Sequence, residues 1–493
     1  MSRALMPAPT PIALLAPLVL ALAGCATSAD VQAPRLDRPQ LAVSAQSSLI
    51  ASSGSLTDAP VPSQWWSLFA DPTLSELQRQ ALESNLDVQT AAARIEESRA
   101  QLGIVRSARL PQIQAQASYS RGALSENSPM VALGAPTDPS DTWAAGFQAS
   151  WELDLWGYHK RRAESASASL EATGFGLEAA RTAVAAEVSR TYLLLRGVQA
   201  REAITERNHD IAQKLVQLTE SRRANGIASR YETAAAHAAM LEVEAGQTQL
   251  AQQRAVLMNA LALLVAKSPR ELNEQLAHGQ LPAMPTRLAV GIPSEVARNR
   301  ADILQADAKL RAAVADIGAA KADFYPRISL TGSLGVQAFD ESDLGDWGSR
   351  QFSVGPTLHL PIFQGGRLKS NLALTEARHQ LAGIAYKKTV LKAWHEVDDA
   401  LTNYTSELTR NQQLEQAQAN NQIALDVARR AYQEGRADMT TVLMAQRTLL
   451  ASDSSLVESK TSSALAVVAI YRALGGGWSD QVVAAVGAGG ERS

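Results

Sequence analysis

The lone cysteine of the chain, Cys25, is the residue whose position indicates the most definite chemistry. It follows Leu22-Ala23-Gly24 at the end of an apolar run that begins at Ile12, and Arg3 supplies a positive charge before that run. This layout is typical of a secretory signal peptide. A thiol at the cleavage point is the acceptor used in bacterial lipoprotein processing, so we expect residues 1–24 to be removed and Cys25 to carry diacylglycerol and N-acyl lipid. The alternative is an ordinary signal peptide with a coincidental cysteine.

The residues after the cysteine indicate where the anchor would lie. Ala26 and Thr27 include no aspartate of the kind that retains lipoproteins in the inner membrane, so by resemblance to lipoprotein sorting rules we expect an outer-membrane anchor. The segment 25–63 is rich in Ser, Ala and Pro, which predicts an extended tether. A mature chain without a second cysteine has no internal disulfide, although it is exported to an oxidising compartment.

Other groups of reactive side chains predict less. His395 and Asp399 stand one helical turn apart, beside Glu396 and Asp398, which is a spacing that metal ligands can have. A tetrahedral site needs further ligands, so a polar stripe on a long helix is the preferred interpretation. Ser and His residues lack the spacing of a nucleophile elbow, and no segment resembles a phosphate-binding loop. We expect no enzyme activity and no cofactor apart from the lipid on Cys25.

The charge of the chain excludes one class of partner. The formal net charge of −3 becomes −4 once Arg3 is removed with the signal peptide. A chain of this charge has no basic field that would attract nucleic acid. No later stretch has the run of about eighteen apolar residues that a membrane-spanning helix needs.

An internal repeat organises the sequence. Pro111 recurs 215 residues later as Pro326, and Gly226 recurs 209 residues later as Gly435. We therefore expect two equivalent halves. The predicted segments are a signal peptide at 1–24, a lipidated tether at 25–63, a first repeat at 64–267, an inter-repeat linker at 268–293, a second repeat at 294–477 and a mobile tail at 478–493.

Each repeat contains two segments in which apolar and polar residues alternate with a period of two, as in β-strands with one polar face. A loop separates the two segments, at 122–141 in the first repeat and at 339–350 in the second. Before the first strand, residues 73–107 predict one helix that ends before Pro111. The apolar positions of the four strands are Ile113, Ala115, Ala117, Tyr119; Phe147, Ala149, Trp151, Leu153, Leu155; Ile328, Leu330, Leu334, Val336; and Phe352, Val354, Leu358, Leu360.

Strands of about ten residues with one apolar and one polar face match those of transmembrane β-barrels. Tyr119, Trp143, Trp151 and Trp156 stand where aromatic girdles would lie, and polar faces rich in Gln and Ser suit a water-filled lumen. A soluble sandwich hairpin is the alternative. Four strands cannot close a barrel, and open edges in hydrocarbon leave backbone groups unpaired, so we expect several protomers to share one barrel.

Two segments without proline, 160–224 and 367–434, predict helices of about 65 residues, or roughly 100 Å. Each is followed, after a glycine turn, by a shorter predicted helix, at 230–266 and 438–473. Helices this long need partners, and their apolar residues have coiled-coil spacing. These residues are Leu177, Val184, Val188, Leu195 and Val198 in the first and Leu374, Leu381, Ile384, Leu391, Trp394, Leu401, Tyr404 and Leu408 in the second.

Several motifs resemble those of a known family. They are Trp65-Trp66-Ser67-Leu68-Phe69-Ala70-Asp71-Pro72, the helix ends at Pro111 and Pro326, Leu153-Asp154-Leu155-Trp156-Gly157, Pro361-Ile362-Phe363-Gln364-Gly365-Gly366 and Tyr471-Arg472-Ala473-Leu474-Gly475-Gly476-Gly477-Trp478. With these motifs in this order, the chain resembles the outer-membrane factors of the TolC type, in particular the lipoprotein branch typified by OprM and NodT.

The resemblance implies a mixed, mainly α fold. It would be a homotrimer in which four strands per protomer form a twelve-stranded outer-membrane β-barrel, continued by a long periplasmic α-helical coiled-coil barrel. The implied function is the outer-membrane exit duct of a tripartite multidrug efflux system, which conducts drugs or other small molecules passively. The implied partners are a periplasmic adaptor (membrane fusion protein), an inner-membrane pump of the RND type and outer-membrane lipid. The alternative is a lipid-anchored periplasmic coiled-coil adaptor or scaffold without a pore, which would be expected to have one helical hairpin rather than two.

The turns between the long and short helices are the predicted periplasmic tip, where such a duct would be sealed. In relatives an Asp-Ala-Gln-Arg segment follows the second turn and its aspartate contributes to a constriction, whereas this chain has Met444-Ala445-Gln446-Arg447. We expect an apolar constriction at Met444 or an acidic ring shifted to Asp438, with simple helix capping as the alternative for Asp438. Arg161-Arg162 and Arg222-Arg223 are interpreted as solvated faces or adaptor contacts. The candidate gate and tip residues are Gly226, Arg230, Tyr231 and Glu232 at the first turn and Tyr432, Gly435, Arg436, Asp438 and Met444 at the second.

Overall fold

The computed structural model describes residues 56–291 and 300–476. Cys25, with the predicted signal peptide and C-terminal tail, lies outside these ranges. Among the described helices, none carries an apolar stretch long enough to cross a membrane. The described residues divide into two compact units: unit 1 contains Glu96–Glu171 and Asp307–Ala385, and unit 2 contains residues 56–95, 172–291, 300–306 and 386–476.

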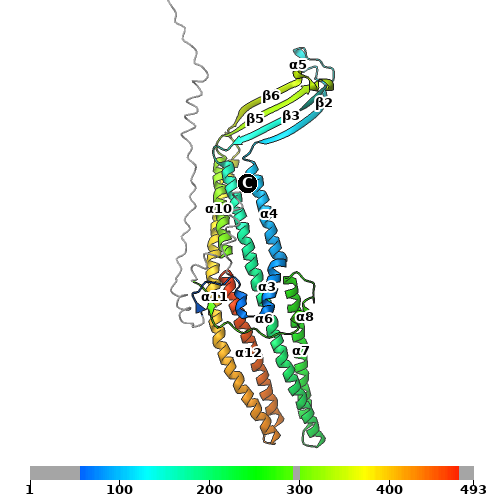
Figure 1. The fold of residues 1–493 in the computed structure, drawn as a ribbon, viewed down its shortest axis with the longest axis vertical. Helices are drawn as coiled ribbons and strands as arrows, with labels where there is room; N and C mark the ends of the chain where they lie inside the picture. Colours follow the sequence, from blue (N-terminus) through cyan, green and yellow to red (C-terminus); the bar gives the residue numbers. More distant parts are fainter. Residues whose placement is uncertain (1–55, 292–299, 477–493) are drawn as a thin grey trace, which may run out of the picture. The chain divides into compact units, whose positions relative to one another are not determined.

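Unit 1 contains one four-stranded antiparallel sheet with the strand order β2-β3-β5-β6 (Figure 1). Both predicted hairpins are confirmed, and the pairing of β3 with β5 joins them. β2 and β6 are the edge strands, and each has one side without a neighbouring strand in the described chain. The strands are β2 (Gln112–Gly122), β3 (Ser140–Leu153), β5 (Arg327–Ala338) and β6 (Arg350–His359).

The start of β3 differs from the prediction. The sequence suggested a loop as far as Asp141, but β3 begins at Ser140, which pairs with Gly122 at the end of β2. Tyr119 and Trp143 lie opposite each other in this part of the hairpin, with their ring centroids 4.4 Å apart. This contact between aromatic side chains stabilises pairing in a segment whose composition is typical of a loop.

The end of β3 also differs. The alternation of residues predicted a strand as far as Leu155, but β3 ends at Leu153. The carboxylate of Asp154 accepts hydrogen bonds from the backbone N–H groups of His159 and Lys160, at 3.0 and 2.7 Å. Because these groups belong to the first turn of the following helix, Asp154 serves the helix start rather than the sheet.

The sheet has one apolar and one polar face. Phe147 and Leu334 lie opposite each other on the apolar face, and both are 61% exposed. Phe352 and Val354 of β6 are on the same face and are also exposed. A contiguous apolar surface of this kind needs lipid or another protein surface to cover it.

Two glycines bring the central strands of the sheet into close contact. Gly146 in β3 lies opposite Gly335 in β5. A Cβ atom on Gly335 would stand 2.6 Å from the carbonyl oxygen of Ala145, and one on Gly146 would stand 2.6 Å from that of Leu334. A methyl group at either position therefore requires backbone atoms to move.

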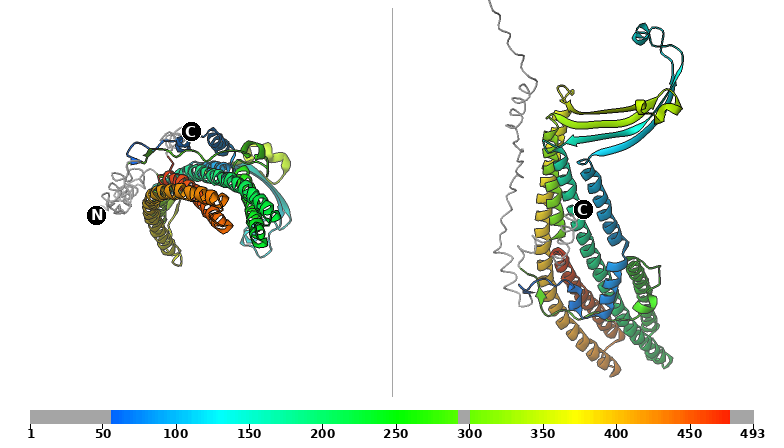
Figure 2. Two further views of the ribbon diagram at one scale, coloured as in Figure 1. Left: turned by 90° about the horizontal axis from the view of Figure 1, so that it is seen from below. Right: turned by 45° about the horizontal axis from the view of Figure 1, so that its top comes forward.

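Two long helical hairpins have the predicted lengths. α6 (Tyr158–Ala224) and α11 (Arg367–Gln433) each have 67 residues, and α7 (Arg230–Leu264) and α12 (Met439–Ala473) each have 35. Within unit 2 the two hairpins lie next to each other (Figure 2). The equal lengths confirm that the chain uses one helical unit twice.

The first predicted helix, 73–107, is in fact two helices, so the prediction of a single helix is wrong. α3 (Pro72–Ser84) and α4 (Leu86–Ser107) are separated by Asn85, whose backbone is extended. The Asn85 Oδ1 atom accepts hydrogen bonds from two backbone N–H groups in the first turn of α4, and its Nδ2 atom donates to the carbonyl oxygen of Leu264. An asparagine that caps the next helix in this way interrupts the backbone ladder of the preceding one.

Smaller elements complete the described chain. In the second repeat α10 has 22 residues, as α4 has in the first. A short parallel pair, β1 with β4, lies in unit 2. These elements are β1 (Leu56–Thr57), η1 (Trp65–Phe69), α5 (Pro129–Ala132), α8 (Asn273–Leu276), β4 (Leu288–Ala289), α10 (Ala301–Ala322), η2 (Glu341–Gly345) and η3 (Trp347–Ser349).

The core of unit 2 is built around aromatic side chains. Trp65 and Tyr471 stack with ring centroids 5.4 Å apart, and both are fully buried. Tyr192 donates a hydrogen bond of 2.6 Å to the Asp71 carboxylate, and burial together with this bond raises the pKa of Tyr192 to about 12. Because Asp71 also caps α3, one carboxylate fixes both the helix start and the tyrosine.

The two predicted coiled-coil stripes are covered to different extents. All five apolar residues predicted for the first long helix are buried. In α11, Leu401 and Tyr404 are buried, but four earlier residues of the stripe are exposed in the single chain. That part of the stripe is left for a partner outside this chain. The four exposed residues are Leu374, Leu381, Ile384 and Leu391.

Replacing Gly335 with Ala is expected to destabilise the sheet by about 1–3 kcal/mol, because the added methyl group would displace backbone atoms of β3. Gly355→Ala is the matched control, since a Cβ atom at Gly355 would meet nothing within 4 Å. The measurement is thermal unfolding of the purified proteins in detergent, followed by circular dichroism. Equal midpoints for the two variants would contradict the close approach of β3 and β5.

Candidate functional site

Both long helices end in the same glycine turn. In the first turn the N–H groups of Gly226 and Ile227 donate to carbonyl oxygens of the last turn of α6, at 2.9 and 2.8 Å. In the second turn Gly435 and Arg436 make the same two bonds to α11, at 3.0 and 2.8 Å. Each glycine has a φ of +71°, which side chains with a Cβ atom rarely adopt. The two turns are therefore Schellman C-caps that need glycine at this place.

The returning helices begin with caps at equivalent positions. Ser229 and Glu232 form a capping box at the start of α7, with bonds of 3.2 and 2.6 Å between each side chain and the backbone of the other residue. Asp438 caps α12 by accepting hydrogen bonds from the hydroxyl and the backbone N–H of Thr441, at 2.6 and 2.8 Å. These bonds lower the pKa of the Asp438 carboxyl from its usual value of 3.8. Asp438 is thus an ionised cap at neutral pH.

Tyr432, near the end of α11, is the most buried of the candidate residues, with 3% of its surface exposed. The guanidinium carbon of Arg222, from α6, lies 4.5 Å from the centroid of its ring. Burial raises the pKa of Tyr432, although the positive charge of Arg222 opposes that shift. The Tyr432 hydroxyl has no hydrogen-bond partner within the described ranges. A cation–π contact therefore joins the ends of the two long helices. The apolar cluster around Tyr432 contains Leu215, Leu425, Ala428, Met439, Val442 and Leu449.

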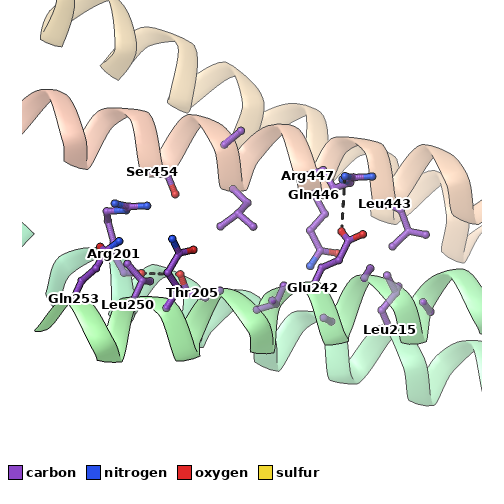
Figure 3. Close-up of a pocket in the computed structure, with 18 residues that line it drawn as sticks. Arg201, Thr205, Leu215, Glu242, Leu250, Gln253, Leu443, Gln446, Arg447 and Ser454 are labelled. Atoms are coloured by element: carbon purple, nitrogen blue, oxygen red, sulfur yellow. Dashed lines mark hydrogen bonds and ion pairs between the residues drawn. The ribbon is translucent and has the colours of Figure 1, made fainter. Parts of the chain in front are cut away.

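A cavity of about 390 Å³ lies beside this cluster, between α6, α7 and α12 (Figure 3). Glu242 of α7 faces Arg447 of α12 across the cavity, with 3.8 Å between carboxylate and guanidinium (Figure 3). Gln446 is buried in its wall, and its Oε1 atom has no hydrogen-bond partner in the part of the chain that the structure describes. Exposed ion pairs of this length contribute little to stability. The two hairpins are therefore loosely packed around this cavity.

The remaining candidate residues are on the surface. Tyr231 is 71% exposed and Met444 is 67% exposed. Arg230 is also exposed, and Arg436 forms an ion pair with the nearby Glu434. The structure therefore gathers no compact cluster from the predicted residues.

Sequence reasoning missed the partner of Tyr432. Arg222 was expected to face solvent or an adaptor, but it is half-buried and its guanidinium covers the Tyr432 ring. The two residues are 210 positions apart, and no local pattern connects them. Only the internal repeat pointed toward this contact. It predicts that the ends of α6 and α11 are equivalent and lie in neighbouring hairpins.

The titratable group near His395 does not form a site in the described ranges. Glu396 forms an ion pair with Arg300 at 2.7 Å, while His395, Asp398 and Asp399 are exposed. No group of three or more His, Cys, Asp or Glu side chains that could hold a metal occurs among the described residues.

The fold and the repeated turns match a known family. The family model described as "Outer membrane efflux protein" matches residues 77–267 and 292–476, one match for each repeat. The chain belongs to the outer membrane efflux proteins. It is 36% identical over 418 residues to outer membrane protein OprJ of Pseudomonas aeruginosa, a match that covers 84% of this chain and 86% of OprJ. It is 30% identical over 479 residues to the cation efflux system protein CusC of Escherichia coli, covering 94% and 97%.

Solved structures of outer-membrane channels have the same fold as this efflux protein. The structure of the channel OprN superposes with a TM-score of 0.82 at 33% identity, covering 87% of this chain and 96% of OprN. The structure of VceC from Vibrio cholerae superposes with a TM-score of 0.79 at 28% identity, covering 85% and 100%.

The efflux protein is accordingly an outer-membrane channel that extends into the periplasm. It is a homotrimer in which each protomer contributes four strands to one barrel, and it works with a periplasmic adaptor and an inner-membrane pump. Sharing the barrel explains the unpaired edges of β2 and β6 and the exposed apolar face of the sheet. The exposed part of the α11 stripe is likewise available to a neighbouring protomer.

Replacing Asp438 with Ala is expected to speed hydrogen exchange of the first amides of α12, whereas Asp438→Asn is expected to leave it unchanged. Asparagine can still accept the bonds from Thr441, and alanine cannot. Because the pKa of Asp438 is lowered in the folded state, its contribution is present above its usual value of 3.8 and is lost as the pH falls through the lowered value.

The Asn variant is the control in this experiment for capping without charge. Slow exchange in the Ala variant would show that the cap is dispensable. Faster exchange in the Asn variant would show that the negative charge itself matters, as an acidic ring requires.

Proposed function

We propose that this channel is the exit duct of an efflux system driven by an RND-type inner-membrane pump, and that it conducts drugs or other small molecules passively, with no catalytic step and no cofactor of its own. The observation that carries the proposal is the match of the described sheet and both helical hairpins to efflux channels over most of the chain. The two faces of the sheet support it, since one is suited to lipid and the other to a water-filled lumen.

A lipid-anchored scaffold without a pore is the competing function. Such a protein has no use for a second, equivalent helical hairpin or for a sheet with an exposed apolar face. The chain has both features, with 67 residues in each long helix and 35 in each returning helix. The duct is therefore the better explanation of the fold.

The proposed cargo is a class of small molecules rather than one compound. The names of relatives describe a solvent efflux pump for SrpC of Pseudomonas putida, pyoverdine export for OpmQ of Pseudomonas aeruginosa and cation efflux for CusC. An exit duct selects mainly by its width and by the charge along its lumen, while the pump upstream selects the cargo. Small molecules delivered by an inner-membrane pump are the class that fits these relatives together.

We further propose that the mature protein begins at Cys25, with diacylglycerol and an N-acyl chain on that residue. The support is the signal-peptide layout before it and the absence of an aspartate in Ala26-Thr27. The protein would then be attached to the outer membrane in two ways, by the lipid on Cys25 and by the inserted barrel. A lipid anchor adds membrane affinity in proportion to the length of its buried acyl chains. A closed barrel stays inserted in the membrane without a lipid anchor.

We place the gate of the channel at the second helix turn. Arg222 over Tyr432 joins the ends of α6 and α11, and the Glu242–Arg447 pair bridges the cavity between α7 and α12. Both contacts would have to break or stretch if the hairpins moved apart to open the tip. Met444, with an apolar and exposed side chain, is the residue suited to form an apolar constriction there.

Replacing Tyr432 with Ala is expected to raise the conductance of the closed channel in planar bilayers, because the change removes the surface on which Arg222 stacks. Tyr432→Phe is the matched control. It should behave like the native protein, since the lost hydroxyl has no partner in the described chain. Native conductance in the Ala variant would remove this contact from the gate.

Deleting the gene is expected to increase sensitivity to the small-molecule substrates of the associated pump, and the native gene on a plasmid should restore resistance.

Cys25→Ser protein is expected to stay in the membrane until detergent is added, because the shared barrel holds it there. Purified native trimers should conduct ions in planar bilayers. Release of the Cys25→Ser variant without detergent, together with absent conductance of the native protein, would support the scaffold instead.

A further inference from the structure

The polar face of the sheet carries charge in one place. The strand register puts alternate residues on this face, and along most of its length they are Gln, Ser, Thr, Ala or Gly. Gln114 donates a hydrogen bond to Gln148 across β2 and β3, which is typical of the neutral part of the face. Its titratable side chains are those of Glu152, Arg327 and His359, all at the strand ends that adjoin the helices of unit 1.

Glu152 belongs to a network in which one negative charge is in excess. The Arg327 guanidinium is 2.5 Å from the Asp323 carboxylate through Nη2 and 3.5 Å from Glu152 through Nη1. The Nε2 atom of His159 lies 3.3 Å from the other oxygen of Glu152. Because Arg327 is already paired closely with Asp323, it compensates the charge of the Glu152 carboxylate only in part.

Asp154, Tyr158 and the Arg121–Asp141 pair do not cancel the charge of Glu152. Asp154 directs its carboxylate to backbone N–H groups at the start of α6. The ring of Tyr158 lies 4.4 Å from the guanidinium carbon of Arg327 and carries no charge. The ion pair between Arg121 and Asp141 is at the opposite end of the sheet and on its apolar face. Glu152 is thus the one partly compensated carboxylate on the polar face of the described strands.

We propose that Glu152 makes the barrel selective for cationic over anionic solutes. The inference rests on the shared barrel as the conduit, in which the polar faces of three sheets surround one lumen. Three Glu152 carboxylates then form a ring at the strand ends that adjoin the helices. A ring of negative charges beside a largely neutral stretch of barrel wall raises the local concentration of counter-ions, so it favours the passage of cations. Arg327 holds the Glu152 carboxylate in place without removing its charge, because Asp323 shares the same guanidinium.

The test is the reversal potential of purified trimers in planar bilayers under a KCl gradient, at low ionic strength. Native channels are expected to favour K⁺ over Cl⁻. Glu152→Gln should reduce that preference by about half or more, and the difference should shrink in 1 M salt, where the Debye length is about 3 Å. Asp141→Asn is the matched control, since it removes a carboxylate of the same strand from the apolar face, and its selectivity should equal the native value.

Two further variants separate charge from a structural role of Glu152. Ser150 is exposed on the same face, two residues along β3, so Ser150→Glu combined with Glu152→Gln should restore the cation preference. Ser150→Arg in the otherwise native chain should shift the preference toward Cl⁻, and it tests the ring even if Glu152→Gln does not assemble.

An unchanged permeability ratio in assembled Glu152→Gln trimers, or in Ser150→Arg trimers, would overturn the proposal. So would a double variant that fails to recover the preference. Absent conductance in the native protein is a different result, because it contradicts the conduit itself rather than the role of Glu152.

Discussion

Backbone N–H and C=O groups along the free edges of β2 and β6 have no partner strand within one chain, and apolar side chains such as Phe352 are exposed on the same sheet. Both features are unfavourable in free energy when the sheet is in water, and unpaired backbone groups are even less favourable in hydrocarbon. A barrel closed by three chains pairs the free edges, and its insertion in lipid covers the apolar face. The other properties of the protein depend on this closure, because only a closed barrel gives the polar face of the sheet a lumen to line and gives the long helices a channel to continue.

The duplicated sequence gives the two halves the same backbone but not the same side chains. Gly226 and Gly435 end the long helices with the same pair of hydrogen bonds, and Ser229 and Asp438 begin the returning helices. Tyr432 has no aromatic equivalent in the first half, since Arg223 stands 209 positions before it. The contact with Arg222 therefore exists once in each protomer. Repetition supplies the shape of the duct, while departures from repetition supply the contacts that we assign to its gate.

Charged residues on the polar face of the sheet are also few and serve more than one role. The polar face of the sheet is neutral along most of its length, and its titratable residues are confined to the strand ends that adjoin the helices. Glu152 comes from β3, Arg327 from β5, and Asp323 directly follows α10, so these ion pairs also connect the strands to a neighbouring helix. The same ion pairs can thus stabilise unit 1 and leave one carboxylate to act on passing solutes.

Local patterns in the sequence determined the strands, the long helices, the glycine turns and the caps, because each depends on residues within a few positions of one another. They failed at Asn85, where composition favours a continuous helix but the side chain bonds to Leu264 and to the first turn of α4. They could not place Arg222 over Tyr432, nor Arg327 beside Glu152, because these pairs are 210 and 175 residues apart. Only the packing of the two repeats against each other brings such residues together, and the candidate gate and the charged group around Glu152 both arise from that packing.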